Sequence, residues 1–174
     1  MGVARNGAII ALSLLASSAF ADQITVKMTL IDEKGQGKSI GSVQLEDGKD
    51  GLVIRPNLTG LPPGEHGFHV HEKPDCGPGE KDGKRQAGLA AGGHYDPKKT
   101  GKHEGPKGQG HAGDLPALRV GDKGEAKGQL TAPRLKVADL RGRSLMIHEG
   151  GDNYSDQPKP LGGGGGRIAC GVAG

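Results

Sequence analysis

Six histidines and one aspartate are the residues of this sequence best suited to metal chemistry: His69, His71, His94, His103, His111, His148 and Asp114. His69 and His71 stand two positions apart in an apolar run, and residues i and i+2 of a β-strand project from the same face. Both imidazoles can therefore bind one ion, although an HxH pair alone is a weak signal. The seventh histidine, His66, is offset by three from His69 and should lie on the opposite strand face. We expect it to be structural, with its ring hydrogen-bonded to the backbone.

A second group of donors follows in a segment rich in glycine and lysine: His94, His103, His111 and Asp114. Short intervals allow a loop to fold three nitrogens and one carboxylate oxygen around an ion, and a closed set of four such donors suits zinc. Two four-coordinate centres need eight donor positions, whereas seven residues are present. One donor must therefore serve both ions, or one site stays incomplete. His94 lies between the two groups and is the candidate for the shared donor.

The elements that must position these donors are predicted to be β-strands. Ile24, Val26 and Met28 alternate with polar residues, which is the period of a half-buried strand. Turn signals separate eight such segments, at residues 24–30, 38–46, 51–58, 65–72, 114–120, 125–131, 144–149 and 167–172. No stretch shows a 3.6-residue apolar repeat. The pattern predicts an all-β antiparallel sandwich or barrel and does not distinguish between the two.

Two long segments, 73–113 and 150–166, interrupt this rhythm. Loops of such length inside a compact domain are usually functional or disordered. The first carries three of the histidines, and metal binding would supply the order that its poor apolar content cannot. The glycines at 162–166 would by themselves be typical of a flexible linker. Their place directly before Arg167 indicates instead that bulk is excluded, so that the backbone can lie close to the site.

Residues 1–21 are typical of a secretory signal. Arg5 lies near the start, an apolar run spans 8–16, and Ala-Phe-Ala at 19–21 forms a small-residue cleavage site. We expect a mature chain of 174 − 21 = 153 residues that begins at Asp22 and folds as one domain, 22–174. No other stretch is long and apolar enough to span a bilayer, so no membrane should hold the mature chain.

The two cysteines, Cys76 and Cys170, agree with export, because the default in an oxidising compartment is a disulfide. Two metal thiolates are the alternative, which the absence of a CxxC pair disfavours.

The net charge of +3 falls to +2 when Arg5 leaves with the signal. Basic and acidic residues are interleaved, and Phe68, Tyr95 and Tyr154 are the aromatic residues left in the mature chain. This composition argues against nucleic acid as a partner.

Five stretches resemble the copper/zinc superoxide dismutases of the bacterial exported type: GEHGFHVH (64–71), GGHYDP (92–97), GHAGDLP (110–116), HEGGDNYSD (148–156) and GRIACGV (166–172). The resemblance spans residues 23–172. It implies a Greek-key β-barrel of eight strands, similar to an immunoglobulin sandwich. It also implies periplasmic localisation, one copper and one zinc ion per chain, and a disulfide between Cys76 and Cys170. Members of this group occur as monomers and as dimers, so a homodimer stays open.

The resemblance also assigns roles to residues. It implies a copper site formed by His69, His71, His94 and His148, and a zinc site formed by His94, His103, His111 and Asp114. His94 would bridge the ions as an imidazolate and store a proton. Arg167 would hold anionic superoxide beside copper, and Asp152 would link copper-side and zinc-side histidines through hydrogen bonds. Lys81, Lys84 and Arg85 would either steer the substrate or form an ordinary solvated surface.

The implied activity converts two superoxide anions and two protons into dioxygen and hydrogen peroxide, while copper is alternately reduced and oxidised. Two other classes of function stay open. One is a copper-binding or copper-delivery protein of the same fold without turnover. The other is a β-domain stabilised by structural zinc, which would leave His69, His71 and His148 unexplained.

Overall fold

The computed structural model describes residues 22–174, so the predicted signal at 1–21 lies outside the described residues. Strands account for most of the regular structure, and helices are limited to single turns. The strands are β1 (Gln23–Asp32), β2 (Gly35–Gly48), β3 (Gly51–Leu58), β4 (Gly64–His66), β5 (Phe68–His71), β6 (Gly79–Lys81), β7 (Lys84–Gln86), β8 (Leu118–Val120), β9 (Leu130–Ala132), β10 (Arg143–His148) and β11 (Arg167–Ala173). The short helices are η1 (Leu89–Ala91), α1 (Val137–Leu140) and η2 (Leu161–Gly163). Among residues 22–174, no helix is both long and apolar enough to cross a bilayer.

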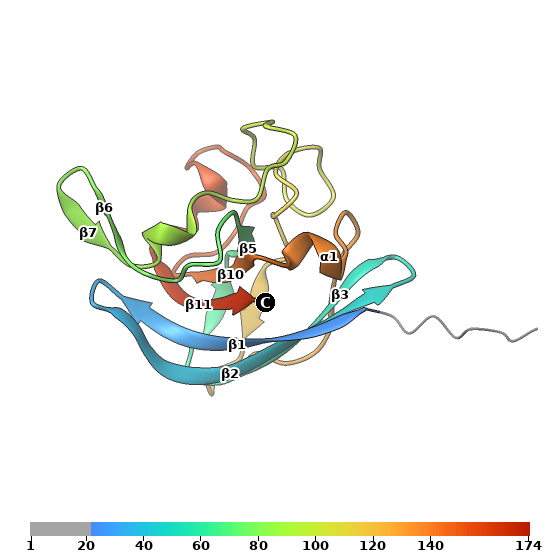
Figure 1. The fold of residues 1–174 in the computed structure, drawn as a ribbon, viewed down its shortest axis with the longest axis horizontal. Coiled ribbons are helices and arrows are strands. Elements are labelled where there is room, and N and C mark those ends of the chain that lie inside the picture. Colours follow the sequence, from blue (N-terminus) through green and yellow to red (C-terminus); the bar gives the residue numbers. More distant parts are fainter. Residues whose placement is uncertain (1–21) are drawn as a thin grey trace, which may run out of the picture.

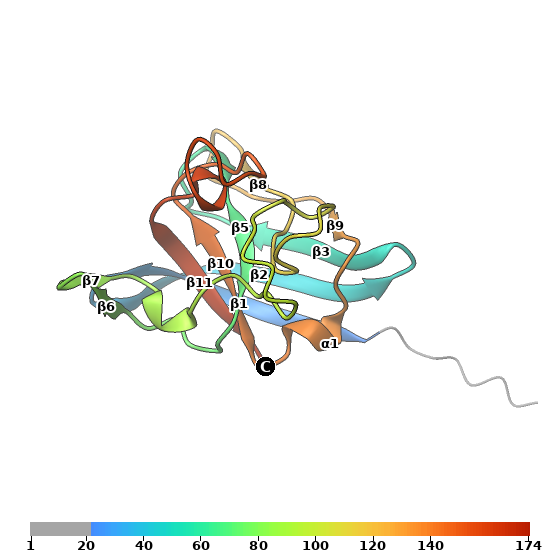
Figure 2. The ribbon, with the colours of Figure 1, turned by 90° about the horizontal axis from the view of Figure 1, so that it is seen from above.

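The main sheet is antiparallel throughout and has the strand order β5-β10-β11-β1-β2-β3-β9. It curls: β1 and β2 bend along one side of the molecule, and the long loops gather on the opposite side, above β5 and β10 (Figures 1 and 2). The pairs β4-β8 and β6-β7 form two further small sheets. The prediction of an all-β antiparallel fold is therefore confirmed.

The apolar alternation read from the sequence becomes the core of the curled sheet. Along β1, Ile24, Val26 and Met28 are buried while the residues between them are exposed. Leu52 and Ile54 of β3 pack into the same cluster. Burying a side chain of this kind contributes roughly 1.5 to 3 kcal/mol, so these positions hold the strands in register.

Gly67 divides the predicted strand 65–72 into β4 and β5. Its N–H donates to the carbonyl of Gly150 (2.8 Å), and its own carbonyl accepts from the N–H of His148 (2.8 Å). A Cβ atom at Gly67 would lie 3.0 Å from Cε1 of His69. Glycine at this point therefore lets the chain pass close beside the histidine cluster.

Several predicted boundaries are wrong. The segments 114–120 and 125–131 form only the short strands β8 and β9, together with isolated bridges at Asp114 and Ala126. The segment 73–113 is not wholly irregular, because it contains the hairpin β6–β7 and the turn η1. The helix α1 was not predicted. It is one turn long and buries only Val137 and Leu140, which is too little to create an apolar repeat.

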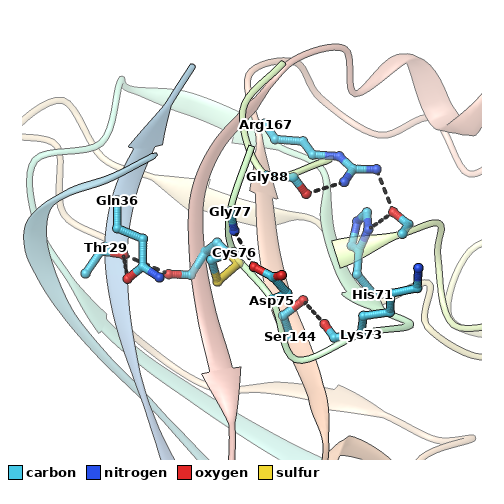
Figure 3. Close-up of a disulfide and its surroundings, with 12 residues drawn as sticks. Thr29, Gln36, His71, Lys73, Asp75, Cys76, Gly77, Gly88, Ser144 and Arg167 are labelled. Carbon is cyan, nitrogen blue, oxygen red and sulfur yellow. Dashed lines mark hydrogen bonds between the residues drawn. A yellow bond between two sulfur atoms is a disulfide. The ribbon is translucent and has the colours of Figure 1, made fainter. Parts of the chain in front are cut away.

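A disulfide between Cys76 and Cys170 attaches the segment after β5 to strand β11 (Figure 3). Both cysteines are buried. Beside them, the N–H of Gly77 donates to Oδ1 of Asp75 (2.7 Å), and Oγ of Ser144 donates to the carbonyl of Lys73 (2.9 Å). The predicted disulfide is thus present, and polar contacts on both sides of Cys76 order the start of the long loop.

Replacing both cysteines (Cys76→Ser with Cys170→Ser) should lower the free energy of unfolding of the metal-free protein by about 4 kcal/mol, because the unfolded chain regains the freedom of a long loop. The two cysteines are 94 positions apart. Urea unfolding followed by circular dichroism, with a chelator present, measures the change. A loss below about 1 kcal/mol would show that native contacts, not the cross-link, hold the loop.

Candidate metal centre

The structure brings the predicted donors together at one end of the curled sheet. His69 and His71 lie on β5, His148 ends β10, and the others come from the loop before β8. The ring of His94 lies at the centre, with its centroid 4.0 Å from that of His69, 5.1 Å from His71, 5.4 Å from both His103 and His111, and 5.9 Å from His148. The ring predicted to be shared therefore contacts both groups.

Strand pairing positions the first group of donors. On β5, Phe68 and Val70 enter the core, so the two histidines share the opposite face. The segment around His94 runs alongside β5, since the N–H of Tyr95 donates to the carbonyl of Val70 (2.8 Å). One donor atom from each of four buried histidines then lies within 4.8 Å of the others: His69, His71, His94 and His148.

The second group of close donors is His69, His94, His103 and Asp114. It contains His69 where the predicted set contains His111. His111 nevertheless lies beside this group, with Nδ1 3.4 Å from Oδ1 of Asp114. His69 is at the boundary between the groups, and its Nε2 is already hydrogen-bonded to Asp152.

Unpaired nitrogens indicate that the donors fit metal cations. Within residues 22–174, four buried ring nitrogens lack a hydrogen-bond partner: Nδ1 of His69, Nε2 of His94, Nδ1 of His103 and Nδ1 of His111. Buried polar atoms are normally hydrogen-bonded, and each exception needs an explanation. Two of them lie near Asp114 without hydrogen-bond geometry, at 3.0 Å for His103 and 3.4 Å for His111. Imidazole and carboxylate donors aimed at a common point suit zinc and copper.

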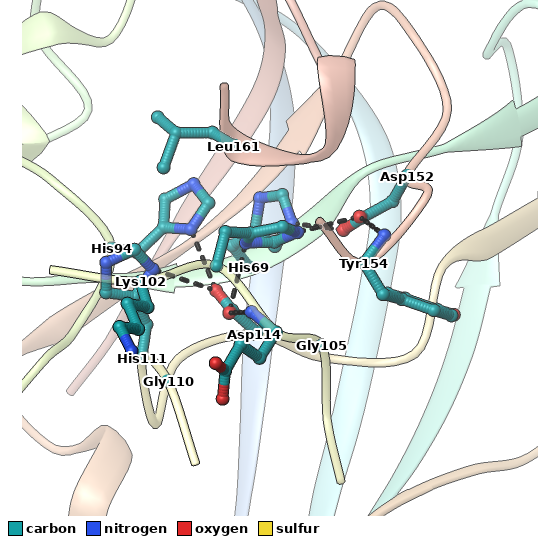
Figure 4. A network of polar contacts seen from close by, with 12 residues as sticks. His69, His94, Lys102, Gly105, Gly110, His111, Asp114, Asp152, Tyr154 and Leu161 are labelled. Atoms are coloured by element: carbon teal, nitrogen blue, oxygen red, sulfur yellow. Dashed lines mark hydrogen bonds and ion pairs between the residues drawn. The ribbon is translucent and has the colours of Figure 1, made fainter. Parts of the chain in front are cut away.

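Asp152 orients a histidine of each group. Its Oδ2 is 2.7 Å from Nε2 of His69, its Oδ1 is 2.7 Å from Nε2 of His103, and the N–H of Tyr154 donates to Oδ1 (2.8 Å; Figure 4). Because each Nε2 is engaged, Nδ1 of both rings remains free to bind a metal.

The backbone at Gly162 packs directly on this carboxylate. Its φ is +70°, and a Cβ atom there would lie only 2.1 Å from Oδ1 of Asp152 and 2.8 Å from Nε2 of His103. A Cβ atom at Gly164 would likewise lie 3.3 Å from Cγ of His148. This close approach supports the interpretation of the glycine-rich segment as a place from which bulk is excluded.

Burial and the two carboxylates set the protonation of the cluster. Burial lowers the pKa of His69, His71 and His148, and it lowers the pKa of His94 to about 3. Burial also acts against protonation of His103, but Asp114 and Asp152 outweigh it and raise its pKa to about 9. Burial acts to raise the pKa of both carboxyl groups, but the surrounding histidines outweigh it and hold each pKa below its usual range. Most of the rings are therefore neutral near pH 7 and ready to act as ligands.

Arg167 is held beside the first group by two backbone carbonyls. Nη1 donates to Gly88 (2.6 Å) and Nη2 to Gly92 (2.8 Å), whose carbonyl is also 2.9 Å from Nδ1 of His71 (Figure 3). One peptide group thus connects the arginine to a predicted copper ligand. Burial lowers the pKa of Arg167, but an arginine guanidinium stays charged in proteins.

A cavity of about 700 Å³ opens over this region, and its lining includes His94, His148, Arg167 and Lys81. Lys34 also lines it and was missed by the sequence analysis, since a lysine in a hairpin turn carries no distinguishing signal. Of the other two predicted steering residues, Lys84 and Arg85, neither is part of the lining, and Nε of Arg85 donates to the carbonyl of Glu33 (2.7 Å).

His66 is structural, as expected. Its Nδ1 lies 2.7 Å from the carbonyl of His148, and its Nε2 lies 2.8 Å from the carbonyl of Pro62. Asp156 was missed: its carboxylate accepts the N–H groups of His103 (2.9 Å) and Leu161 (3.1 Å) and so joins the two long loops. A single aspartate in a turn gives no sign of that role from sequence alone.

Two adjoining groups of buried imidazole and carboxylate donors on an antiparallel β-domain define a protein with a two-metal centre. The family model "Copper/zinc superoxide dismutase (SODC)" matches residues 39–173. The chain is 56% identical over 166 residues to "Superoxide dismutase [Cu-Zn]" of Escherichia coli (strain K12), covering 95% of each chain. It therefore belongs to the copper/zinc superoxide dismutase family.

Solved structures agree with this assignment. "Cu/Zn superoxide dismutase from Brucella abortus" has a TM-score of 0.87 and 53% identity, and the match covers 88% of this chain and 100% of that one. "The Solution Structure of the Monomeric Copper, Zinc Superoxide Dismutase from Salmonella enterica" has a TM-score of 0.78 and 56% identity, and the match covers 87% and 99%. The curled sheet is the Greek-key β-barrel of this family. The protein is a superoxide dismutase with copper and zinc as cofactors, and the alternative of a non-catalytic copper carrier is not favoured.

Proposed function

We propose that one copper ion is held by His69, His71, His94 and His148, and that one zinc ion is held by His94, His103, His111 and Asp114. The observation that carries this proposal is the position of the His94 ring between the two groups. Its Nδ1 lies 2.9 Å from Oδ1 of Asp114, while its buried Nε2 has no hydrogen-bond partner among residues 22–174. A ring with one nitrogen toward each group is the arrangement that a shared ligand requires.

Bound copper supplies the one-electron chemistry that turns two superoxide anions and two protons into dioxygen and hydrogen peroxide. The chain supplies attraction and orientation of the substrate. Arg167 donates two hydrogen bonds to the carbonyls of Gly88 and Gly92, which fix the plane of its guanidinium group. Its other N–H groups remain available to an oxygen of the substrate. Since it lines the cavity beside His148, its charge should hold the anion next to the copper-side donors.

The chain also handles a proton. His94 lines the cavity and is neutral at pH 7 because burial lowers its pKa to about 3. We assign to Nε2 of His94 the role of holding a proton and delivering it to the reduced substrate beside Arg167.

Replacing His148 (His148→Ala) should remove superoxide dismutase activity while one zinc ion per chain remains. His148 belongs only to the copper-side group, so its loss opens that site and spares the other. Metal analysis combined with a superoxide consumption assay checks both parts. Full activity in this variant would refute the copper assignment.

Arg167→Gln serves as the matched variant. It should retain both metals, because Arg167 is no ligand in this assignment, and should lower kcat/KM by about 10-fold or more. It should also weaken the dependence of the rate on ionic strength, since a substrate-facing charge is gone. An unchanged kcat/KM would show that residues other than Arg167 attract the substrate.

We propose further that residues 1–21 are removed during export and that residues 22–174 act in the periplasm as one domain. The disulfide between Cys76 and Cys170 supports an oxidising compartment, and the signal-like sequence of residues 1–21 supports export. Cell fractionation followed by N-terminal sequencing should find the chain in the periplasm with Asp22 first. Recovery of an intact Met1 in the cytoplasm would contradict this.

We propose that the chain acts as a monomer, in preference to the homodimer that the sequence leaves open. Within residues 22–174, the large apolar side chains that are well exposed are Tyr154, Leu161 and Val172, and two of them belong to the segment 150–166. Stable homodimer interfaces usually need a larger apolar patch. Sedimentation velocity should give a single species of one chain's mass, and a species of twice that mass would overturn the proposal.

A further inference from the structure

The loop that carries two predicted zinc ligands has no apolar core of its own. Between His103 and His111 the chain reads Glu-Gly-Pro-Lys-Gly-Gln-Gly, and none of these residues belongs to a hydrophobic cluster of the described chain. Ordering such a segment costs roughly 1 to 2 kcal/mol of backbone entropy for each residue. Some other interaction must offset that cost if the two rings are to be held in place.

The guanidinium group of Arg134 holds this loop through hydrogen bonds to four backbone carbonyls. Nε of Arg134 donates to the carbonyl of Pro106 (3.1 Å), and Nη1 donates to that of Gly110 (2.9 Å). Nη2 donates to the carbonyls of Gly105 (3.1 Å) and His111 (2.5 Å). Arg134 forms no ion pair with any residue of 22–174, so its donors are directed at this loop alone. The carbonyl group of His111 itself is one of the four acceptors.

Arg134 lies in the turn after the edge strand of the main sheet. It follows β9, which pairs with β3, and its neighbours Ala132 and Leu135 are buried. The guanidinium therefore attaches the loop to the residues that directly follow the main sheet. Among the other contacts of the loop, the N–H of His111 donates to the carbonyl of Lys102 (2.8 Å), and Gly105 packs closely against the ring of Tyr154 in the segment 150–166.

The two ends of the loop are anchored independently. The N–H of His103 donates to Asp156 (2.9 Å), which belongs to the other long loop. At the far end, Arg134 holds the backbone of His111. Each ring is thus restrained from outside the cluster, and Arg134 is the restraint that belongs to His111.

We propose that Arg134 is a positioning residue for zinc: by binding four carbonyls of the loop 105–111, it holds His111 in place before the ion arrives and so raises zinc affinity. This inference rests on the proposed zinc ligands. Pre-ordering reduces the conformational entropy that must be lost on binding. A planar fork with several donors can satisfy four carbonyls at once, whereas a lysine ammonium is a compact point charge that cannot span them.

The test is a titration of the full mature chain, stripped of metal, with Zn²⁺ in competition with a chromophoric chelator. Arg134→Gln and Arg134→Lys should both raise the dissociation constant for zinc by about 10-fold to 100-fold, the range seen when groups that orient metal ligands are lost. Copper affinity should change by less than threefold, because His69, His71 and His148 do not lie in this loop. Arg119→Gln is the matched control, since Arg119 is 88% exposed, 3.5 Å from Glu65, and should leave zinc binding unchanged.

A spectroscopic and a chemical readout separate positioning from general loss of folding. Co²⁺ bound at the zinc site of Arg134→Gln should show a visible absorption spectrum different from that of the unsubstituted protein, because the position of His111 relaxes. Millimolar methylguanidinium should restore zinc affinity to Arg134→Ala, and methylammonium should not.

Three outcomes would overturn the inference. Zinc affinity within twofold of the unsubstituted chain in Arg134→Gln would show that His111 needs no such restraint. An equal loss of zinc and copper affinity, with no effect of methylguanidinium, would assign Arg134 to folding alone. Failure of the unsubstituted chain to bind zinc would instead refute the ligand assignment on which the inference rests.

Discussion

Two carboxylates buried among imidazoles impose the constraint on which this structure depends. Asp114 is 1% exposed and Asp152 is 6% exposed, and both stay ionised because histidines surround them. Burying an unpaired charge costs several kcal/mol, so positive charge must be supplied nearby. Burial at the same time discourages protonation of most of the rings, and His103, with a pKa near 9, can supply only one proton to the two anions. Metal cations resolve this conflict, because they balance the carboxylates while the imidazoles remain neutral ligands.

The two groups of donors are positioned by different physical means. Strand register sets the copper-side group: His69 faces Met146 across the β5–β10 pair, and β10 continues to His148 at its end. Hydrogen bonds to loops set the other group, through Asp156, Asp152 and, in our inference, Arg134. The strands place His69 and His148, while the ring of His69 is also oriented by Asp152 and His94 comes from a loop. The group held by loops needs polar contacts in place of an apolar core. Glycine is required at position 162 because the backbone there lies against Asp152 and leaves no room for a Cβ atom.

The sequence predicts those parts of the structure that leave a pattern of residue types. The HxH pair and the alternation of β1 identify strands and their buried faces, and the predicted segment 51–58 coincides with β3 (Gly51–Leu58). Patterns of residue types do not predict contacts in which a side chain binds backbone groups. The four acceptors of Arg134 are carbonyl groups, which every residue carries, so no spacing of side chains reveals them. The hairpin β6–β7 is formed mostly by exposed charged residues without apolar alternation. The choice of a barrel over a sandwich came from the family resemblance of the motifs rather than from periodicity, and the solved structures agree with it.

The same contacts argue against copper delivery as the role of this chain. A carrier must release its ion, which requires donors that can move apart at low cost. Here His69 is hydrogen-bonded to Asp152, and His71 is bonded to the carbonyl that also holds Arg167. Moving His69 would break a hydrogen bond to a charged carboxylate, worth about 1.5 to 3 kcal/mol, and moving His71 would break a bond to a neutral carbonyl, worth about 0.5 to 1.5 kcal/mol. A centre with such restrained ligands, beside a cavity that is lined by Arg167, is suited to retain its metal while a small anion enters and leaves.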